Sequence, residues 1–172
     1  LLLQQKIDAV KTICACDKGD LVAHSMGGLA ARQYIQSNDY QQDVDQLIFL
    51  GTPHLGAPKA YLMWEGGETD PVGFFNLVLW RILDQEAKEE GYADLFSYLQ
   101  NEPILSVQEL LPVYDYIFEG AQLRTYPDSY PRNLFLENLK AHINDLENSG
   151  VEIHNFVGET QTQQTIIGID ST

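Results

Sequence analysis

Apolar positions along the chain fall into two patterns: short continuous runs, and longer stretches with helical spacing. Residues 20–24, 46–51 and 151–157 predict three strands. The second of them contains the fully apolar run Leu47–Leu50, which is typical of a strand in a parallel sheet covered on both faces. Other stretches have apolar residues three or four positions apart, which predicts helices packed on that sheet. Residues 1–16 carry one such face, formed by Leu3, Ile7, Val10 and Ile13. Strands that alternate with helices predict an α/β fold.

Residues 57–132 break this alternation and predict a separate helical segment. The stretch Phe74–Leu83 has apolar side chains on nearly every helical face, in a region rich in aromatic residues. After this segment the core pattern resumes with a helical apolar face, and residues 160–172 are mostly polar and loop-like. We therefore expect an α/β core made of residues 1–56 and 133–172, incomplete at both ends, with a helical cap inserted over 57–132.

The composition excludes several classes of function. The chain has 25 acidic against 10 basic residues, a formal net charge of −15 and no basic cluster longer than two residues. Nucleic-acid binding needs patches of Lys and Arg, so we expect no nucleic-acid partner, and the charge also disfavours anionic membrane surfaces. No apolar run approaches the length of a membrane span. The sequence contains no cluster of metal ligands, so we expect neither a metal nor an organic cofactor.

The two cysteines, Cys14 and Cys16, are separated by a single residue. Cysteines this close in sequence are poorly placed to bridge each other, so we expect two free or buried thiols, which leave the redox compartment open. The chain also begins without Met and ends soon after a strand, which we interpret as a fragment. The sequence therefore assigns no localisation.

The stretch around Ser25 carries the most specific chemical signal. The apolar run Leu21–Ala23 ends two residues before this serine, and a helical run begins at Leu29. Small residues, Ala23 and Gly27, stand two positions on either side, as a sharp turn between strand and helix requires. This arrangement predicts a nucleophile elbow that exposes the Ser25 hydroxyl at the edge of the sheet. The alternative is that Ser25 caps an ordinary helix.

Two motifs carry a resemblance to a known group of enzymes. The sequences Ala-His-Ser-Met-Gly-Gly-Leu-Ala-Ala-Arg at 23–32 and Leu-Gly-Thr-Pro-His-Leu-Gly-Ala-Pro at 50–58 resemble those of α/β-hydrolase lipases. The most similar branch is the lecithin:cholesterol acyltransferase-like group with its phospholipase relatives, and residues 106–116 are similar to a cap segment of bacterial members. The resemblance implies a partial α/β-hydrolase fold, with a parallel sheet flanked by helices and a helical cap insertion.

The same resemblance implies a serine lipase or esterase of phospholipase-like type, which cleaves acyl esters of lipids through an acyl-enzyme on Ser25. Two alternatives stay open. One is an O-acyltransferase of the lecithin:cholesterol acyltransferase type, and the other is a non-catalytic module that binds a partner through its aromatic cap. The expected partner is a lipid or another acyl ester. Transient contact with a lipid surface stays open, and the sequence identifies no protein partner.

An acyl-enzyme mechanism needs an oxyanion donor, a histidine base and an acid besides the nucleophile. In α/β-hydrolases the residue after the nucleophile supplies one backbone donor, here Met26, and we expect the second donor upstream of Leu1. The acid precedes the histidine in these enzymes. Glu159 follows the last strand, where many hydrolases carry their acid, and is the candidate within this chain. We expect the histidine, and in the resembling branch a later Asp, beyond Thr172.

The four histidines differ in how well their positions suit a base. His154 is the candidate base within the chain, although its place in the middle of a strand favours a core histidine. His24 lies inside the elbow motif, and His54, followed by Leu55, lies on the loop after the second strand. We expect His24, His54 and Leu55 to shape the rim of the site. His54 precedes every plausible acid in the chain, which argues against a role as the base. We expect His142 at the surface or in packing.

The apolar helical stretch that begins near Phe74 offers a place for an acyl chain. One of its faces can pack on the core, and the other needs more protein or an apolar ligand. We expect Phe74 or Trp80 to line the acyl path above Ser25, with plain core packing as the alternative.

Overall fold

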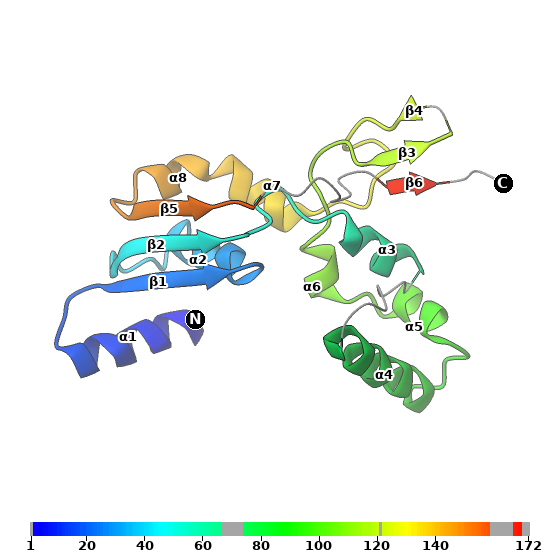
Figure 1. The fold of residues 1–172 in the computed structure, drawn as a ribbon, viewed down its shortest axis with the longest axis horizontal. Coiled ribbons are helices and arrows are strands. Elements are labelled where there is room, and N and C mark those ends of the chain that lie inside the picture. Colours follow the sequence, from blue (N-terminus) through cyan, green and yellow to red (C-terminus); the bar gives the residue numbers. More distant parts are fainter. Residues whose placement is uncertain (1, 67–73, 121, 159–166, 170–172) are drawn as a thin grey trace. The chain divides into compact units, whose positions relative to one another are not determined.

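The chain folds into two units (Figure 1). The computed structural model describes residues 2–66, 74–120, 122–158 and 167–169. The first unit comprises Leu1–His54 and Leu134–Gln163, and the second comprises Leu55–Asn133 and Gln164–Thr172. Each unit has a hydrophobic core of its own.

The first unit is built on a three-stranded parallel sheet with the strand order β1–β2–β5. Leu47 in the central strand lies opposite Leu21 of β1 and Ile153 of β5. A helix returns the chain from the first strand to the parallel second strand, which confirms the predicted α/β class. In chain order the elements are α1 (Leu2–Cys14), β1 (Gly19–His24), α2 (Gly27–Ile35), β2 (Val44–Leu50), α7 (Leu134–Ala141), α8 (Ile143–Glu147) and β5 (Glu152–Phe156).

The helices α1, α2 and α8 cover one face of this sheet. Leu47 and Phe49 on that face are 0% and 2% exposed. On the other face Ile48 and Leu50 are half-buried, and Val22 is 66% exposed. Among the described residues, the expected burial of the strands on both faces therefore holds for one face. The core on the covered face contains Ile7, Ala23, Ala31, Tyr34, Ile35, Val44, Leu47, Phe49 and Leu146.

A buried polar pair holds the loop that leads into the central strand β2. Tyr34 of α2 and Asp43, the residue before β2, are each 1% exposed. The Tyr34 hydroxyl donates to Oδ1 of Asp43 at 2.8 Å, and it accepts the backbone N–H of Gln41 at 3.4 Å. Burial, and then the hydrogen bond to Asp43, raise the pKa of Tyr34 well above its ordinary value, so the hydroxyl remains a donor. The pair therefore ties α2 to the loop that precedes β2.

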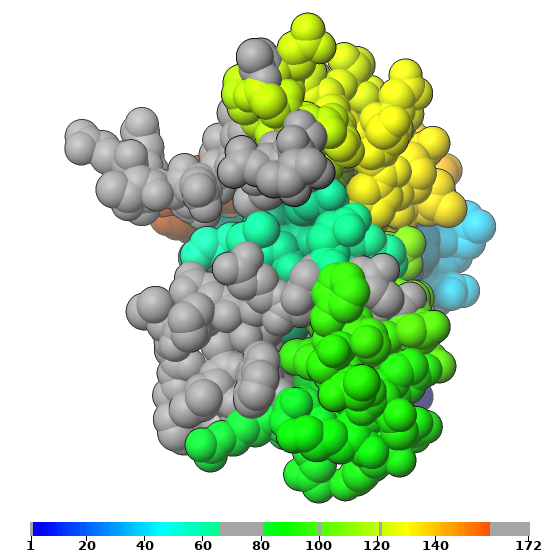
Figure 2. All heavy atoms as spheres, turned by 90° about the vertical axis from the view of Figure 1, so that its right-hand side faces the viewer, coloured from blue at the N-terminus to red at the C-terminus, as the bar shows by residue number. Residues whose placement is uncertain are grey.

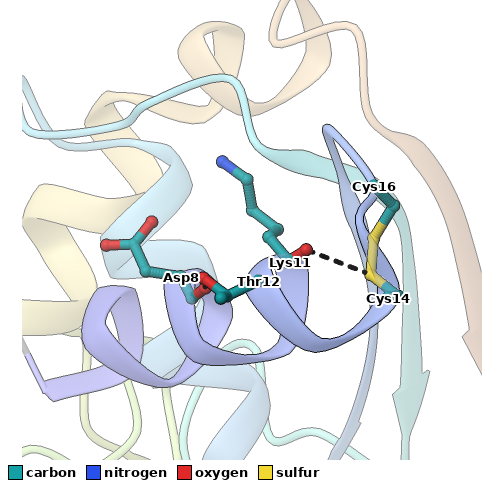
Figure 3. The surroundings of a disulfide bond; sticks show 5 residues. All are labelled: Asp8, Lys11, Thr12, Cys14 and Cys16. Atoms are coloured by element: carbon teal, nitrogen blue, oxygen red, sulfur yellow. Dashed lines mark hydrogen bonds between the residues drawn. A yellow bond between two sulfur atoms is a disulfide. The ribbon is translucent and has the colours of Figure 1, made fainter.

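The two cysteines form a disulfide, contrary to the expectation of free thiols (Figure 3). Their Cα atoms are 5.3 Å apart, within the range that a disulfide requires. Ala15 between them has a φ of 53°, a left-handed conformation that turns the chain back at the end of α1. The prediction was wrong because the spacing alone does not reveal this turn.

The second unit combines helices, of which the part from residue 81 to 108 is green in Figure 2, with a small sheet of order β4–β3–β6. β3 is antiparallel to β4 and parallel to β6. The sequence pattern predicted helices alone over 57–132, because strands of two or three residues are too short to show a period. β6 comes from the tail that was expected to be a loop of the first unit. The elements are α3 (Lys59–Gly66), α4 (Phe74–Glu89), α5 (Leu95–Asn101), α6 (Leu105–Gln108), β3 (Ile117–Glu119), β4 (Gln122–Leu123) and β6 (Ile167–Ile169).

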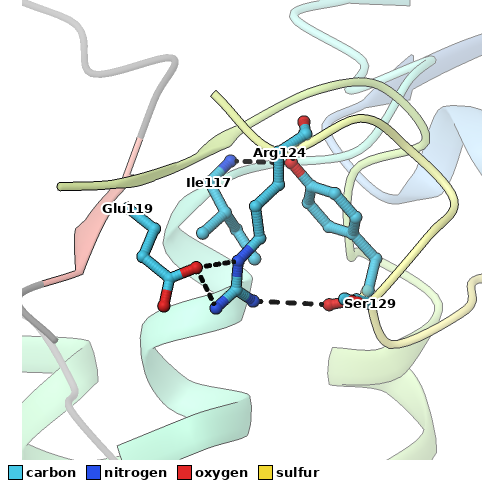
Figure 4. Close-up of polar contacts among 5 residues, drawn as sticks. Ile117, Glu119, Arg124 and Ser129 are labelled. Atoms are coloured by element: carbon cyan, nitrogen blue, oxygen red, sulfur yellow. Dashed lines mark hydrogen bonds and ion pairs between the residues drawn. The ribbon is translucent and has the colours of Figure 1, made fainter. Parts of the chain in front are cut away.

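Tyrosines form the core beside this small sheet. The buried Tyr130 hydroxyl accepts the backbone N–H groups of Tyr116 and Ile117, at 3.2 and 3.1 Å. The same hydroxyl donates to the Arg124 carbonyl at 2.8 Å. The Arg124 side chain in turn forms an ion pair with Glu119 of β3 at 2.8 Å (Figure 4). These contacts hold the chain after β4 against β3.

Tyr34→Phe should lower the free energy of unfolding by about 1–3 kcal/mol, because Asp43 would lose its buried donor and water would not replace it. Urea unfolding measures the change. Tyr40→Phe is the matched control: the Tyr40 hydroxyl is half-buried and its bond to the Val44 carbonyl is long, at 3.5 Å. We expect the control to change stability by less than about 0.5 kcal/mol. Equal losses in the two variants would contradict the role given to the Tyr34–Asp43 pair.

Candidate active site

Ser25 stands at a sharp turn between β1 and α2. Its φ is 53°, in the left-handed region that residues other than Gly seldom adopt. The Ser25 N–H donates to the Leu50 carbonyl at the end of β2, at 3.0 Å, so the turn lies at the carboxyl edge of the sheet. Met26 rather than Ser25 occupies the N-cap position of α2, and no side chain caps the helix. The predicted sharp turn from strand to helix is therefore present, and Ser25 does not occupy the position of an ordinary N-cap serine.

Gly28, in the first turn of α2, lies against the chain at the end of β2. A Cβ at this position would overlap the Thr52 side chain and would come within 2.8 Å of the Phe49 ring. A Cβ at Gly27 would meet nothing within 4 Å. The helix that follows Ser25 can therefore approach β2 only because residue 28 lacks a side chain.

The backbone N–H of Met26 is placed where it can donate to an anionic group. Among the described residues it donates to no hydrogen-bond acceptor, and the Met26 side chain is 46% exposed. It stands at the amino end of α2, where the helix dipole favours negative charge. A group with these properties can donate to an oxyanion formed beside Ser25.

Arg32 is a buried cation one turn further along α2, with 4% of its surface exposed. Its Nη1 lies 3.2 Å from Nδ1 of His54, and its Nη2 donates to the Leu139 carbonyl at 3.1 Å. An arginine can only donate, so Nδ1 of His54 is the acceptor. The proton of the neutral imidazole is therefore on Nε2.

This arrangement does not suit His54 as the base for Ser25. In a serine triad the Nδ1 atom of the histidine donates to the acid, while Nε2 accepts the serine proton. Burial, followed by the charge of Arg32, lowers the pKa of His54, and a hydrogen bond with the Asn155 side chain acts in the opposite direction. Sequence reasoning named His54 but missed Arg32. The available signal was its position four residues after Gly28, on the same face of the helix.

The remaining histidines have partners or positions of their own. His154 lies in the middle of β5, with Nε2 3.2 Å from a carboxylate oxygen of Glu152. His24 is the exposed last residue of β1, and His142 lies between α7 and α8. In the described part of the chain, no histidine is hydrogen-bonded to the Ser25 hydroxyl.

Four other predicted site residues are not brought to Ser25 by the described structure. Glu159 lies outside the described residues, and so do the side chains of Phe74 and Trp80, whose backbone belongs to α4. Leu55 is 48% exposed and belongs to the second unit. Their roles stay predictions.

The described residues offer neither a metal centre nor a membrane-spanning helix. Over residues 2–66, 74–120, 122–158 and 167–169, no three His, Cys, Asp or Glu side chains gather where they could hold a metal ion. None of the helices described has the length and apolar character needed to cross a bilayer.

The sequence matches a known protein family over most of its length. The model of the lecithin:cholesterol acyltransferase family covers residues 2–163. The chain belongs to this family. The matched region contains the Ser25 turn, Arg32 and His54, so these features lie in the part of the chain that the lecithin:cholesterol acyltransferase family shares.

Comparison with other proteins gives two further findings. No curated protein matches the chain. A solved structure, that of a Tle4–Tli4 complex, is similar with 16% sequence identity and a TM-score of 0.47, over 87% of this chain and 38% of that chain. This member of the lecithin:cholesterol acyltransferase family therefore spans less than half of that solved chain.

Gly28→Ala should destabilise the protein by about 1–3 kcal/mol, because the new methyl group would push α2 away from Thr52 and Phe49. Gly27→Ala is the control, since its methyl group would meet open space and helical alanine is favoured over glycine. Urea unfolding of the two variants measures the difference. Similar stability in both would show that α2 does not need its close approach to β2.

Proposed function

We propose that this chain carries the nucleophile of a serine lipase or esterase of phospholipase-like type, which acts on acyl esters of lipids. The observation that carries the proposal is the left-handed φ of Ser25, 53°, at a turn from the end of a strand to the start of a helix. Such strain at a non-Gly residue is typical of functional sites. Membership of the lecithin:cholesterol acyltransferase family supports acyl-ester chemistry.

The proposed reaction proceeds through a covalent intermediate. The Oγ of Ser25 forms a bond to the ester carbonyl carbon, while a base accepts the hydroxyl proton. The bond to the leaving alcohol then breaks, and that alcohol takes the proton from the base. In the second step water attacks the acyl carbon while the base accepts its proton, the bond between the acyl group and Oγ breaks, Oγ takes the proton from the base, and the fatty acid is released. The Met26 N–H donates to the oxyanion in both steps, and loss of one such donor costs about 2.7–4 kcal/mol of transition-state stabilisation in an unrelated serine hydrolase.

In this proposal the base and its acid partner come from outside the described residues. Within the chain, Glu159 is the candidate acid and His154 the candidate base. We favour a base outside the described residues, because a catalytic histidine of this fold lies on a loop, whereas His154 lies within β5 beside Glu152.

An O-acyltransferase is the second candidate function, because the matching family takes its name from that reaction. An alcohol would then replace water in the second step and accept the acyl group from Ser25. Product analysis of the intact protein with a lipid ester and a long-chain alcohol separates the two reactions. Formation of a new ester supports transfer, and release of fatty acid alone supports hydrolysis.

Ser25→Ala should abolish covalent labelling of the intact protein by a fluorophosphonate probe, because the probe reacts with activated serine hydroxyls. Ser106→Ala, at an exposed position of α6, is the control and should be labelled like the wild type. Mass spectrometry of the labelled peptide identifies the site. Equal labelling of wild type and Ser25→Ala would refute Ser25 as the nucleophile, and the absence of labelling in both would favour a non-catalytic binding module.

Trp80→Ala should reduce kcat/KM for long-chain esters much more than for acetate esters, if Phe74 and Trp80 line the acyl path. The reason is that each methylene buried by the protein contributes about 0.8 kcal/mol. Ile82→Ala, at a 56% exposed position of the same helix, is the control and should leave both activities unchanged. A uniform loss across chain lengths with a lower melting temperature would instead assign Trp80 to core packing.

A further inference from the structure

α2 packs on the sheet through an apolar face that contains Ala31, Tyr34 and Ile35, and a second, more polar face lies beside it. Gly28, Arg32 and Gln36 follow one another at intervals of four residues and so lie on the same face. The Arg32 guanidinium reaches His54 on the loop after β2. The Gln36 side chain donates to the Leu139 carbonyl at 2.8 Å. This face therefore joins α2 both to the loop after β2 and to the end of α7.

Arg32 is buried without a carboxylate partner among the described residues. Its contacts are the His54 ring, the His54 carbonyl at 3.5 Å, the Leu139 carbonyl and the Gln36 side-chain oxygen at 3.2 Å. Leu139 lies in the last turn of α7, where carbonyls lack helical partners and the helix dipole favours a cation. Burial lowers the pKa of Arg32, but an arginine keeps its charge at physiological pH. No carboxylate in the described part of the chain pairs with Arg32, and after burial its charge is the next cause that lowers the pKa of His54.

His54 receives contacts from three elements of the first unit. α2 contributes Arg32, and β2 contributes Phe49, whose ring meets the imidazole edge-on with centroids 4.7 Å apart. β5 contributes Asn155, which lies opposite Phe49 in the sheet and shares a side-chain hydrogen bond with His54. Arg32 is the charged group among these three neighbours, and Phe49 and Asn155 do not titrate. With Nδ1 accepting from Arg32, the proton on Nε2 is available to the Asn155 oxygen.

We propose that Arg32 is a positioning residue: it holds His54 as a neutral imidazole protonated on Nε2, and through it fixes the loop after β2 against the helix that begins beside Ser25. The proposed role of Ser25 rests on the function proposed above, whereas the state of the His54 ring does not. Arg32 acts through His54 and touches no reacting atom. Its effect on the reaction comes from the position of the Ser25 turn, which the same loop supports through Thr52 and Gly28.

The proposal requires a charge at position 32 as well as a hydrogen-bond donor. If the Arg32 charge were removed, the pKa of His54 would rise, because the positive charge beside the ring is one of the causes that lower it. A protonated His54 carries a proton on Nδ1 and cannot accept there. The contact between α2 and the loop would then depend on pH in the acidic range.

The ring of His54 can be observed directly in the intact protein labelled with ¹⁵N-histidine, with His54→Asn used to assign its signals. We expect a neutral ring with the proton on Nε2 in the wild type. In Arg32→Gln, which keeps a donor but removes the charge, the titration of His54 should move to higher pH. In Arg32→Lys, which keeps the charge, it should stay close to the wild type. A proton on Nδ1 in the neutral wild-type ring overturns the proposal, and so does an unmoved titration in Arg32→Gln.

The reaction of Ser25 gives the second measurement. In Arg32→Gln the rate of fluorophosphonate labelling should fall about 10- to 100-fold, the size expected for a misplaced reacting group. The acid limb of the pH profile of this rate should also move to higher pH. Gln36→Leu is the matched control, because Gln36 accepts from Arg32 and shares the Leu139 carbonyl with it, but no hydrogen bond joins Gln36 to His54 among the described residues. It should lower the melting temperature and leave the acid limb unchanged. If both variants lose activity only in proportion to their stability, Arg32 is structural and the proposal fails.

The two measurements can refute the function proposed for Ser25 and the role proposed for Arg32 independently of each other. An unlabelled wild-type protein refutes the function proposed for Ser25, and the His54 spectra still decide whether Arg32 holds the ring. An unchanged His54 ring in Arg32→Gln refutes the positioning role even when Ser25 is labelled at the normal rate.

Discussion

The positive φ of Ser25 constrains the packing of the first unit on both sides of the turn. A serine with positive φ is stable only where the surrounding structure holds both sides of the turn. On one side the Ser25 N–H is bound to the Leu50 carbonyl, so β1 must pair in register with β2 up to its last residue. On the other side α2 must start immediately, close to β2, which residue 28 allows because it is a glycine. The short strands, the small residues and the buried helix face all follow from this turn.

The same close packing creates an electrostatic problem at Arg32. A helix so near the sheet buries whatever stands on its inner face, and here that face carries a guanidinium. An isolated buried charge is unstable unless its donors are satisfied. Among the described residues, the partners of the Arg32 guanidinium are a helix end, an amide oxygen and an imidazole rather than a carboxylate, in a chain that is strongly acidic.

The sequence predicted the first unit better than the second. Short apolar runs identified β1 and β2, and the sequence pattern also located β5, although its Ile153 and Phe156 are 38% and 61% exposed. The small residues around Ser25 identified the turn because its steric requirements are strict. It did not predict β3, β4 and β6, whose pairing is set by tertiary contacts such as those of the Tyr130 hydroxyl. It also missed the Arg32–His54 contact, since a hydrogen bond between residues 22 positions apart leaves no periodic signal. The disulfide was missed because the backbone turn at Ala15 has no sequence signature.

The pairing of β6 with β3 has a consequence for how the chain is made. β3 is synthesised before α7, α8 and β5, all of which belong to the first unit, and its parallel partner β6 follows β5. On the ribosome, where chains emerge from the amino end and local contacts form first, β3 and β4 can pair early, but β6 can join them only after β1, β2 and β5 have emerged. The second unit is therefore not a removable insertion: excision of residues 55–133 would leave β6 without its partner strand. Each unit is interrupted by the other, and neither can be completed by a continuous stretch of chain.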